Sequence, residues 1–170
     1  MTIVRDSCSF FSFAPKLFVM QEIKQELYKK CQDFVQDRIK SLEQAIQSAQ
    51  DAAANDTKSS AGDKYETTRE MMQQEISRNQ TQLHEAKKVK HSLEQINPAS
   101  AASTEVKNGS LVITSNGNFY ISVSAGQIKI GNSVYFAISP ASPVGRVLSG
   151  LKTGDKCTFN NKEILIQSIS

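Results

Sequence analysis

Residues 23–49 read IKQELYKKCQDFVQDRIKSLEQAIQSA, and their spacing decides the first half of the fold. Apolar residues recur every three or four positions, at Ile23, Leu27, Cys31, Val35, Ile39, Leu42, Ile46 and Ala49. Side chains at this spacing lie along one side of an α-helix. The pattern therefore predicts a long helix that buries one narrow stripe.

A second stripe follows at Tyr65, Met72, Ile76, Asn79, Leu83, Ala86, Leu93 and Ile96. Its spacing is close to the alternation of three and four residues that is typical of coiled coils. Between the stripes, residues 55–62 read NDTKSSAG, which supplies helix-capping and turn residues, and Ser60 with Asp63 forms a capping-box pattern. We therefore expect an antiparallel coiled coil over residues 20–97, with its tip at about 55–63 and arms about 45 Å long.

The composition changes after Asn97. Residues 97–103 read NPASAAS, which predicts a helix stop followed by a linker over residues 98–108. Residues 20–97 carry 12 basic and 13 acidic side chains, whereas residues 98–170 carry 6 and 3 and contain three of the four prolines. The two halves therefore belong to different domains.

Short runs typical of β-strands fill residues 109–170. They lie at 111–114, 119–124, 127–130, 134–139, 156–159 and 163–169. Asn116-Gly117 separates the first two runs and is a strong hairpin signal. Pro143 and Gly150 bound a short helix. The expected fold is α+β: an N-terminal antiparallel helical hairpin followed by a small antiparallel β domain with one short helix.

Residues 1–19 fit neither half. Four of the eight phenylalanines lie here without clear periodicity, at Phe10, Phe11, Phe13 and Phe18. The apolar run is broken by Pro15 and Lys16, and no cleavage motif follows, so the segment does not match a signal peptide. We expect a poorly ordered extension, with Met20 as an alternative start.

Composition also limits the class of function. The net charge of +3 is too balanced for a protein that coats nucleic acid or anionic lipid. No apolar run reaches the roughly 18–20 residues of a membrane helix, so we expect no membrane association. The three cysteines are odd in number and far apart, which favours a reducing compartment and a cytoplasmic location.

We find no self-contained active site in the sequence. Ser149 and Lys152 match a Ser-x-x-Lys motif, but Lys152 also begins the Lys-Thr-Gly match, and one residue does not serve both motifs. His84 and His91 are seven residues apart, about 10 Å along a helix, which is too far to share a metal. The protein is therefore expected not to be an enzyme and to hold no cofactor of its own.

Carboxylates surround the predicted hairpin tip, at Asp51, Asp56, Asp63 and Glu66. Two interpretations stay open. These side chains are caps and solvated turn residues, or they are oxygen ligands that a rigid rod delivers to a hard cation in another protein.

Residues 138–155 read ISPASPVGRVLSGLKTGD and are followed by a terminal strand that includes LIQSI at 165–169. This segment resembles the C-terminal signature of the Gre transcript-cleavage factors, roughly Ser-Pro-Leu-Gly-Arg-Ala-Leu-Leu-Gly, three residues, Gly-Asp. The family also carries an antiparallel coiled coil before a small β domain of FKBP-like type, so the resemblance covers about residues 21–170.

The resemblance implies a bacterial transcription elongation factor. Such a factor, here expected to be a monomer, binds RNA polymerase at its secondary channel and rescues backtracked or paused complexes by stimulating the polymerase's own RNA cleavage. Its β domain docks on the channel rim, which assigns docking to Ser142, Pro143 and Arg146. Its tip comes close to the RNA 3′ end and helps to hold a magnesium ion of the polymerase active site, which assigns that role to Asp56 and Asp63.

The tip departs from the family pattern Asp-Leu-x-Glu-Asn-Ala-Glu-Tyr. With its Asp on Asp56, the family's Glu falls on Ser59, and about two extra residues precede Tyr65. Either Asp63 compensates, or the protein is a secondary-channel regulator that does not stimulate cleavage.

Two further alternatives belong to other classes. A coiled-coil adaptor requires a second apolar face, but the outward positions are glutamines: Gln44, Gln47, Gln73, Gln74, Gln80 and Gln82. A prolyl isomerase requires a pocket lined by aromatic side chains. The candidates are few enough to be core residues instead: Phe119, Tyr120, Tyr135, Phe136 and Phe159.

Overall fold

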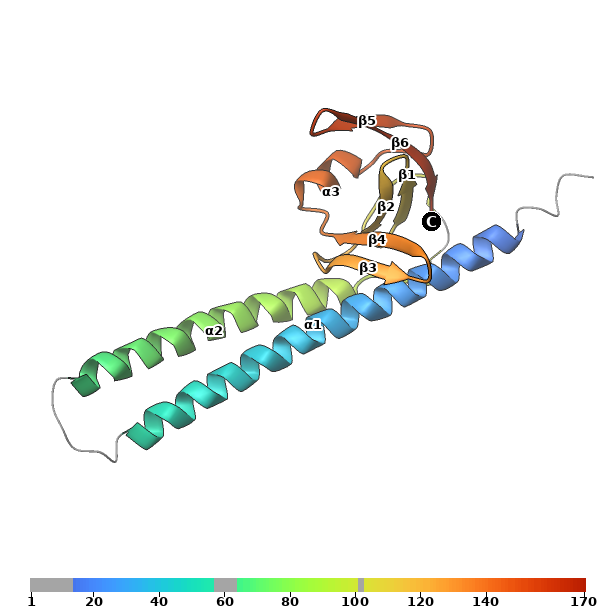
Figure 1. Cartoon of the computed structure of the whole chain (residues 1–170). Helices are drawn as coiled ribbons and strands as arrows, with labels where there is room; N and C mark the ends of the chain where they lie inside the picture. The colour runs from blue at the N-terminus through green and yellow to red at the C-terminus, as the bar shows by residue number, and fades with distance from the viewer. Residues whose placement is uncertain (1–13, 57–63, 101–102) are drawn as a thin grey trace, which may run out of the picture. The chain divides into compact units, whose positions relative to one another are not determined.

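The structure is a computed structural model that describes residues 14–56, 64–100 and 103–170. Two helices, α1 (Ala14–Asp56) and α2 (Lys64–Glu94), precede the β domain. The elements that follow are β1 (Leu111–Thr114), β2 (Gly117–Ile121), β3 (Gly126–Ile130), β4 (Ser133–Ile138), α3 (Pro143–Leu148), β5 (Lys156–Phe159) and β6 (Lys162–Ile169). The fold is therefore α+β (Figure 1).

The chain divides into two compact units. One contains the chain up to Cys31 together with Ile96–Ser170, and the other is Gln32–Gln95. The first unit thus includes the β domain and the early part of α1, whereas the second consists of the rest of α1 with α2 and the segment that joins them.

The two helices of the second unit run antiparallel. Lys87 Nζ lies 3.2 Å from Glu43 Oε1, and Lys90 Nζ donates to Gln36 Oε1 over 3.2 Å. Positions later in α2 therefore face positions earlier in α1. This pairing confirms the predicted helical hairpin over the part of the chain that the structure describes.

Within the second unit, part of the predicted apolar stripes forms a buried seam between these helices, whereas Leu27 and Cys31 of the first stripe belong to the other unit. Ile46, Ala49 and Ile76 are each less than a tenth exposed and pack as a cluster to which Leu83 is added. The six outward glutamines named above are all exposed. The burial pattern follows the three-and-four spacing because only that side of each helix meets its partner.

The helix α1 begins at Ala14, earlier than the start at Met20 that the sequence suggested. Pro15 does not prevent this, because a proline in the first helical turn removes only an amide that has no intrahelical acceptor. Residues 1–13 of the expected extension lie outside the described residues.

The β domain contains one six-stranded sheet with the order β3-β4-β2-β1-β6-β5 (Figure 1). All neighbouring strands are antiparallel except β2 and β4, which are parallel. The expectation of a purely antiparallel sheet was wrong at this pair. In the β3–β4 hairpin, β4 and not β3 pairs with β2. The sequence pattern of a hairpin does not specify which of its two strands pairs with the rest of the sheet.

Two hairpin turns explain the strand bounds. The β5–β6 turn consists of Asn160 and Asn161 at φ +50° and +61°, the left-handed conformation that tight hairpin turns require. In the β1–β2 hairpin, Thr114 pairs with Gly117, and Thr114 Oγ1 donates to the Gly117 carbonyl over 2.7 Å. β2 therefore begins at Gly117, two residues before the predicted start.

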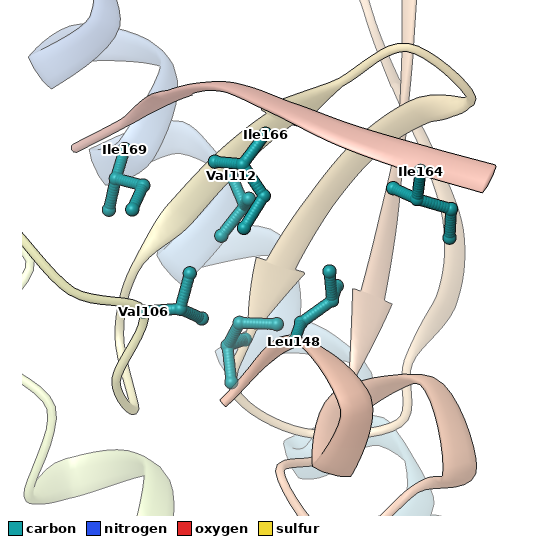
Figure 2. Packing of buried hydrophobic residues seen from close by; sticks show 7 residues of the cluster. Val106, Val112, Leu148, Ile164, Ile166 and Ile169 are labelled. Carbon is teal, nitrogen blue, oxygen red and sulfur yellow. The ribbon is translucent and has the colours of Figure 1, made fainter. Parts of the chain in front are cut away.

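One face of the sheet packs against α3 through the main core. This core consists of Val106, Val112, Ile121, Leu148, Ile164, Ile166 and Ile169 (Figure 2). Val106 lies in the segment expected to be a linker, but it is only 2% exposed, and its amide donates to the Leu151 carbonyl over 2.8 Å. Residues near Val106 are therefore part of the β domain.

The other face of the sheet carries a second buried layer, which includes the early part of α1. Tyr120 is fully buried there, and Cys31 Sγ lies 3.6 Å from Ser122 Oγ. Lys24 is 1% exposed, and its Nζ donates to the carbonyl and the hydroxyl of Ser100, each over 3.4 Å. Burial, with a smaller contribution from the charge of Lys107, lowers the pKa of Lys24.

The Tyr120 hydroxyl has no hydrogen-bond partner among the residues that the structure describes. Burial raises the pKa of this hydroxyl, and the nearby Cys31 and Tyr28 act in the same direction. A buried hydroxyl without a partner is a cost to folding, because it has lost its bonds to water.

We therefore predict that Tyr120→Phe leaves stability at pH 7 unchanged or raises it by up to about 1 kcal/mol. In the unfolded chain Tyr120 ionises near pH 10, whereas in the folded chain it stays neutral. The wild type should therefore lose stability more steeply than Tyr120→Phe as pH rises above about 10. Denaturant unfolding of both chains at pH 7 and at about pH 11 measures this.

The matched control is Tyr135→Phe. Tyr135 is the other buried tyrosine of the sheet, but its hydroxyl is not a buried polar atom without a hydrogen-bond partner. A loss of more than about 1 kcal/mol in Tyr120→Phe at pH 7 would show that the Tyr120 hydroxyl has a partner in solution.

Candidate functional site

Residues 139–146, which lead from β4 into the first turn of α3, form a hydrogen-bonded cap. Ser142 is the N-cap of α3: its Oγ accepts from the Gly145 amide over 3.0 Å and donates to the Ser139 carbonyl over 2.7 Å. The Ser142 amide also donates to the Ser139 carbonyl, over 2.9 Å. The Ser139 hydroxyl in turn accepts from the Ala141 amide over 3.2 Å. These bonds fix the backbone that leads into α3.

Gly145 permits the close approach that this cap needs. A Cβ at this position would collide with the Ser139 carbonyl oxygen and would lie 2.9 Å from Ser142 Oγ. Backbone atoms of the cap do not yield as a flexible side chain does. Glycine at this position of the signature therefore has a structural cause in this chain.

Pro143 and Arg146, two of the three predicted docking residues, are exposed, and Ser142 is half-buried. Pro143 occupies the first turn of α3, where its fixed φ favours the helix. Arg146 follows one turn later and forms no ion pair with any residue in the described ranges. The cap therefore exposes a conformationally fixed proline and a guanidinium that no described carboxylate of the chain neutralises.

The hairpin tip lies between the end of α1 at Asp56 and the start of α2 at Lys64. Asp51 is exposed, and its Oδ1 accepts from Gln47 Nε2 over 2.9 Å. Asp56 and Glu66 belong to the two helices, but their side chains are outside the described part. Asp63 and Ser59 fall entirely outside the described residues. The predicted metal-ligand set at the tip therefore stays a prediction.

The described residues contain no cluster of three or more His, Cys, Asp or Glu side chains that could hold a metal ion. His84 and His91 are both exposed on α2, as expected for solvated helix residues. Lys152 of the Ser-x-x-Lys match pairs with Glu105, with Nζ 3.3 Å from Oε1. The lysine is therefore engaged by a carboxylate and not by Ser149.

The five candidate aromatic residues do not all share one face of the sheet. Phe119 and Phe136 are paired in the β2–β4 register, and their ring centroids are 5.9 Å apart. Tyr120 follows Phe119 on β2, and Tyr135 precedes Phe136 on β4. Because adjacent residues of a strand point to opposite faces, the two tyrosines lie on the other face of the sheet. The aromatic side chains therefore belong to separate layers.

A charge signal in the sequence was not used in predicting the docking residues. No Asp or Glu occurs from residue 106 to residue 154, a stretch that includes four basic residues, β1–β4 and α3. Lys129 on β3 belongs to this stretch and is exposed. The absence of carboxylates along this stretch is the sequence signal that draws attention to Lys129.

The chain matches none of the protein families, curated proteins or solved structures with which it was compared. Within the described ranges, neither long helix is apolar enough over a sufficient length to cross a bilayer.

The geometry of the cap predicts the effect of two substitutions. Ser142→Ala removes the N-cap oxygen and should destabilise the β domain by about 1 kcal/mol. Gly145→Ala should cost more, about 1–3 kcal/mol, because the added methyl group displaces the cap backbone. Ser149→Ala, at the exposed C-terminal end of α3, is the control and should stay within about 0.5 kcal/mol of the wild type. Denaturant unfolding measures all three, and a Gly145→Ala chain as stable as the control would refute the close-approach argument.

Proposed function

We propose that this protein is a Gre-type factor that binds RNA polymerase at the secondary channel and promotes rescue of backtracked or paused complexes by stimulating the polymerase's own RNA cleavage. In this proposal residues 109–170 form a docking domain of FKBP-like type, and the helical hairpin carries the tip to the active site. The protein assists catalysis by its partner and has no active site of its own.

The observation that carries this proposal is the cap at Ser142, Pro143 and Gly145. The signature residues that suggested the family occupy a preformed loop at the start of α3, in a small β domain that follows an antiparallel helical hairpin. A loop that is already ordered loses little conformational entropy on binding. Its exposed Pro143 and Arg146 then supply an apolar contact and a charge for the polymerase surface.

The helical hairpin is long enough to carry its tip far from its base. From Gln32 to Asp56 the helix α1 extends about 37 Å at 1.5 Å per residue. Carboxylates at the end of such a rod would act as oxygen ligands for a magnesium ion shared with the polymerase, which activates a water molecule for phosphodiester hydrolysis. We propose Asp56 as the first such ligand and Asp63 as the second.

The second candidate within this class is a secondary-channel regulator without cleavage stimulation. The feature that favours it is Ser59, which stands where the family has a glutamate. A serine hydroxyl supplies no negative charge to a metal, so Asp63 must compensate if cleavage is stimulated.

The alternatives from other classes have less support. An adaptor rod needs a second apolar face, and the outward glutamines of the hairpin are exposed and polar. A prolyl isomerase needs one aromatic pocket, and the alternation of side chains separates Phe119 and Phe136 from Tyr120 and Tyr135.

The docking part of the proposal predicts that Pro143→Asp weakens association with bacterial RNA polymerase by about tenfold or more. Aspartate is compatible with the first turn of a helix, so the domain should still fold. Asn161→Asp adds the same charge at the exposed β5–β6 turn, next to the edge strand opposite β3, and should bind normally. Unchanged affinity of Pro143→Asp in an equilibrium binding assay would remove the cap from the interface.

The tip part of the proposal predicts that Asp56→Asn lowers stimulated RNA cleavage at least about tenfold while polymerase binding and stability persist. Asp56 ends α1, and asparagine is accepted at a helix C-terminus but does not supply a negative charge. Asp63→Asn should have a smaller effect. Asp51→Asn is the control, since Asp51 already accepts from Gln47. The assay is cleavage of RNA in a stalled elongation complex.

Two results would change the conclusion on the tip. If the wild type stimulates cleavage and both Asp56→Asn and Asp63→Asn retain it, these residues do not lend a metal ligand. If the wild type stimulates none but competes with a cleavage factor for polymerase, the regulator is the correct function.

A further inference from the structure

The β domain has a long stretch without negative charge, and part of its positive charge is unpaired. Between Glu105 and Asp155 the basic residues are Lys107, Lys129, Arg146 and Lys152, and there is no carboxylate. Lys152 pairs with Glu105, but Lys129 and Arg146 have no ion pair with a described residue. Exposed cations that form no ion pair are available to a negatively charged partner.

The strand register places Lys129 beside exposed aromatic surface. Gln127 is opposite Phe136 across the β3–β4 pair, and Lys129 is opposite Val134. Residues opposite each other share a face, as do residues two apart on one strand. Lys129, Gln127 and Phe136 therefore lie on the same face as Phe119, and we call these four residues the aromatic–lysine face.

One aromatic ring of this face, that of Phe136, is accessible, whereas Phe119 is half-buried against the core. Phe136 is 38% exposed, and its ring is tilted by 34° from that of Phe119. Gly117 lies beside it: a Cβ there would be 3.6 Å from Phe136 Cε2, so a side chain at this position would cover that ring edge. Two residues after Phe136, Ile138 continues the same face and is half-buried against the core. The exposed apolar surface of β4 is therefore centred on Phe136.

We propose that the aromatic–lysine face binds an acidic segment of the protein partner, with an apolar side chain of that segment against Phe136 and a carboxylate paired with Lys129. This inference rests on the proposed function, because the partner is the polymerase that the cap engages, and it specifies the chemistry of the surface on which the β domain docks.

A protein segment fits this face better than a nucleic acid. Affinity for a nucleic acid depends strongly on several phosphates being neutralised by Lys or Arg side chains, whereas this face offers Lys129 alone. Phe136 and Phe119 are tilted against each other instead of forming separate platforms for successive bases. Their apolar surface suits one buried anchor surrounded by polar contacts, as in protein interfaces.

A charged residue at position 129 also has a purely structural explanation, and the experiment must distinguish it from partner binding. β3 is an edge strand, and charged side chains on edge strands prevent pairing with other chains. Lys129→Glu keeps a charge at the edge but reverses its sign. It therefore preserves protection against aggregation and abolishes charge complementarity.

The test measures equilibrium binding of the full-length chain to bacterial RNA polymerase at low and at high salt. Lys129→Glu should weaken binding about tenfold at low salt, and the deficit should shrink at high salt as charges are screened. Phe136→Ser should weaken binding about tenfold at both salts, whereas Phe136→Tyr, which keeps the ring, should bind normally. Lys162→Glu, at the exposed β5–β6 turn, is the charge-reversal control. Circular dichroism melting verifies that each variant is folded.

The outcomes separate this inference from the proposed function. If Pro143→Asp weakens binding but Lys129→Glu and Phe136→Ser do not, the aromatic–lysine face is not the interface and the proposed function stands. If the wild type does not bind polymerase, both are overturned. A single-stranded uridine oligonucleotide is titrated in parallel. Oligonucleotide binding that Phe136→Ser abolishes, with polymerase binding unchanged, would assign the face to nucleic acid and overturn the inference.

Discussion

The β domain depends on a sheet that is apolar on both faces. Leu111 and Val112 are adjacent on β1 and point to opposite faces, yet both are fully buried, and Tyr120 and Ile121 on β2 are buried in the same way. A sheet of this kind needs a covering layer on each side. α3 contributes to one layer, and the early part of α1 belongs to the other. This requirement explains why the β domain and the chain up to Cys31 form one compact unit.

The cap before α3 follows from a second constraint, the satisfaction of backbone polar groups. A short helix leaves amides at its start without intrahelical acceptors. Ser142 supplies one acceptor, and its hydroxyl proton satisfies the Ser139 carbonyl in return. The closeness of these groups leaves no room for a Cβ at Gly145. The same bonds that complete the helix also fix Pro143 and Arg146 on the surface, so stability and the proposed docking geometry have one physical origin.

Local sequence patterns predicted the elements well where the signal is local. The three-and-four spacing gave the two helices, and the Asn pair at 160–161 agrees with the left-handed turn between β5 and β6. Non-local choices were not accessible in the same way. The parallel pairing of β2 with β4 and the burial of Val106 both depend on which distant segments meet in the sheet. Phe136 was named as a core candidate, but its exposure depends on how far α3 covers the sheet, which no single strand encodes.

The carboxylates are distributed unevenly between the two parts of the chain for which different functions are proposed. Residues 20–97 are nearly neutral and hold 13 of the 17 carboxylates, whereas the stretch from residue 106 to residue 154 has none. A metal-lending tip needs carboxylates, and an acidic docking surface would repel them. Placing the carboxylates on the helices allows both requirements to be met in one chain. Docking through Lys129 would then weaken with salt, while magnesium ligation inside a protein cavity is screened far less. The salt dependence of binding and that of cleavage in an already formed complex should therefore differ, because they originate in different parts of the molecule.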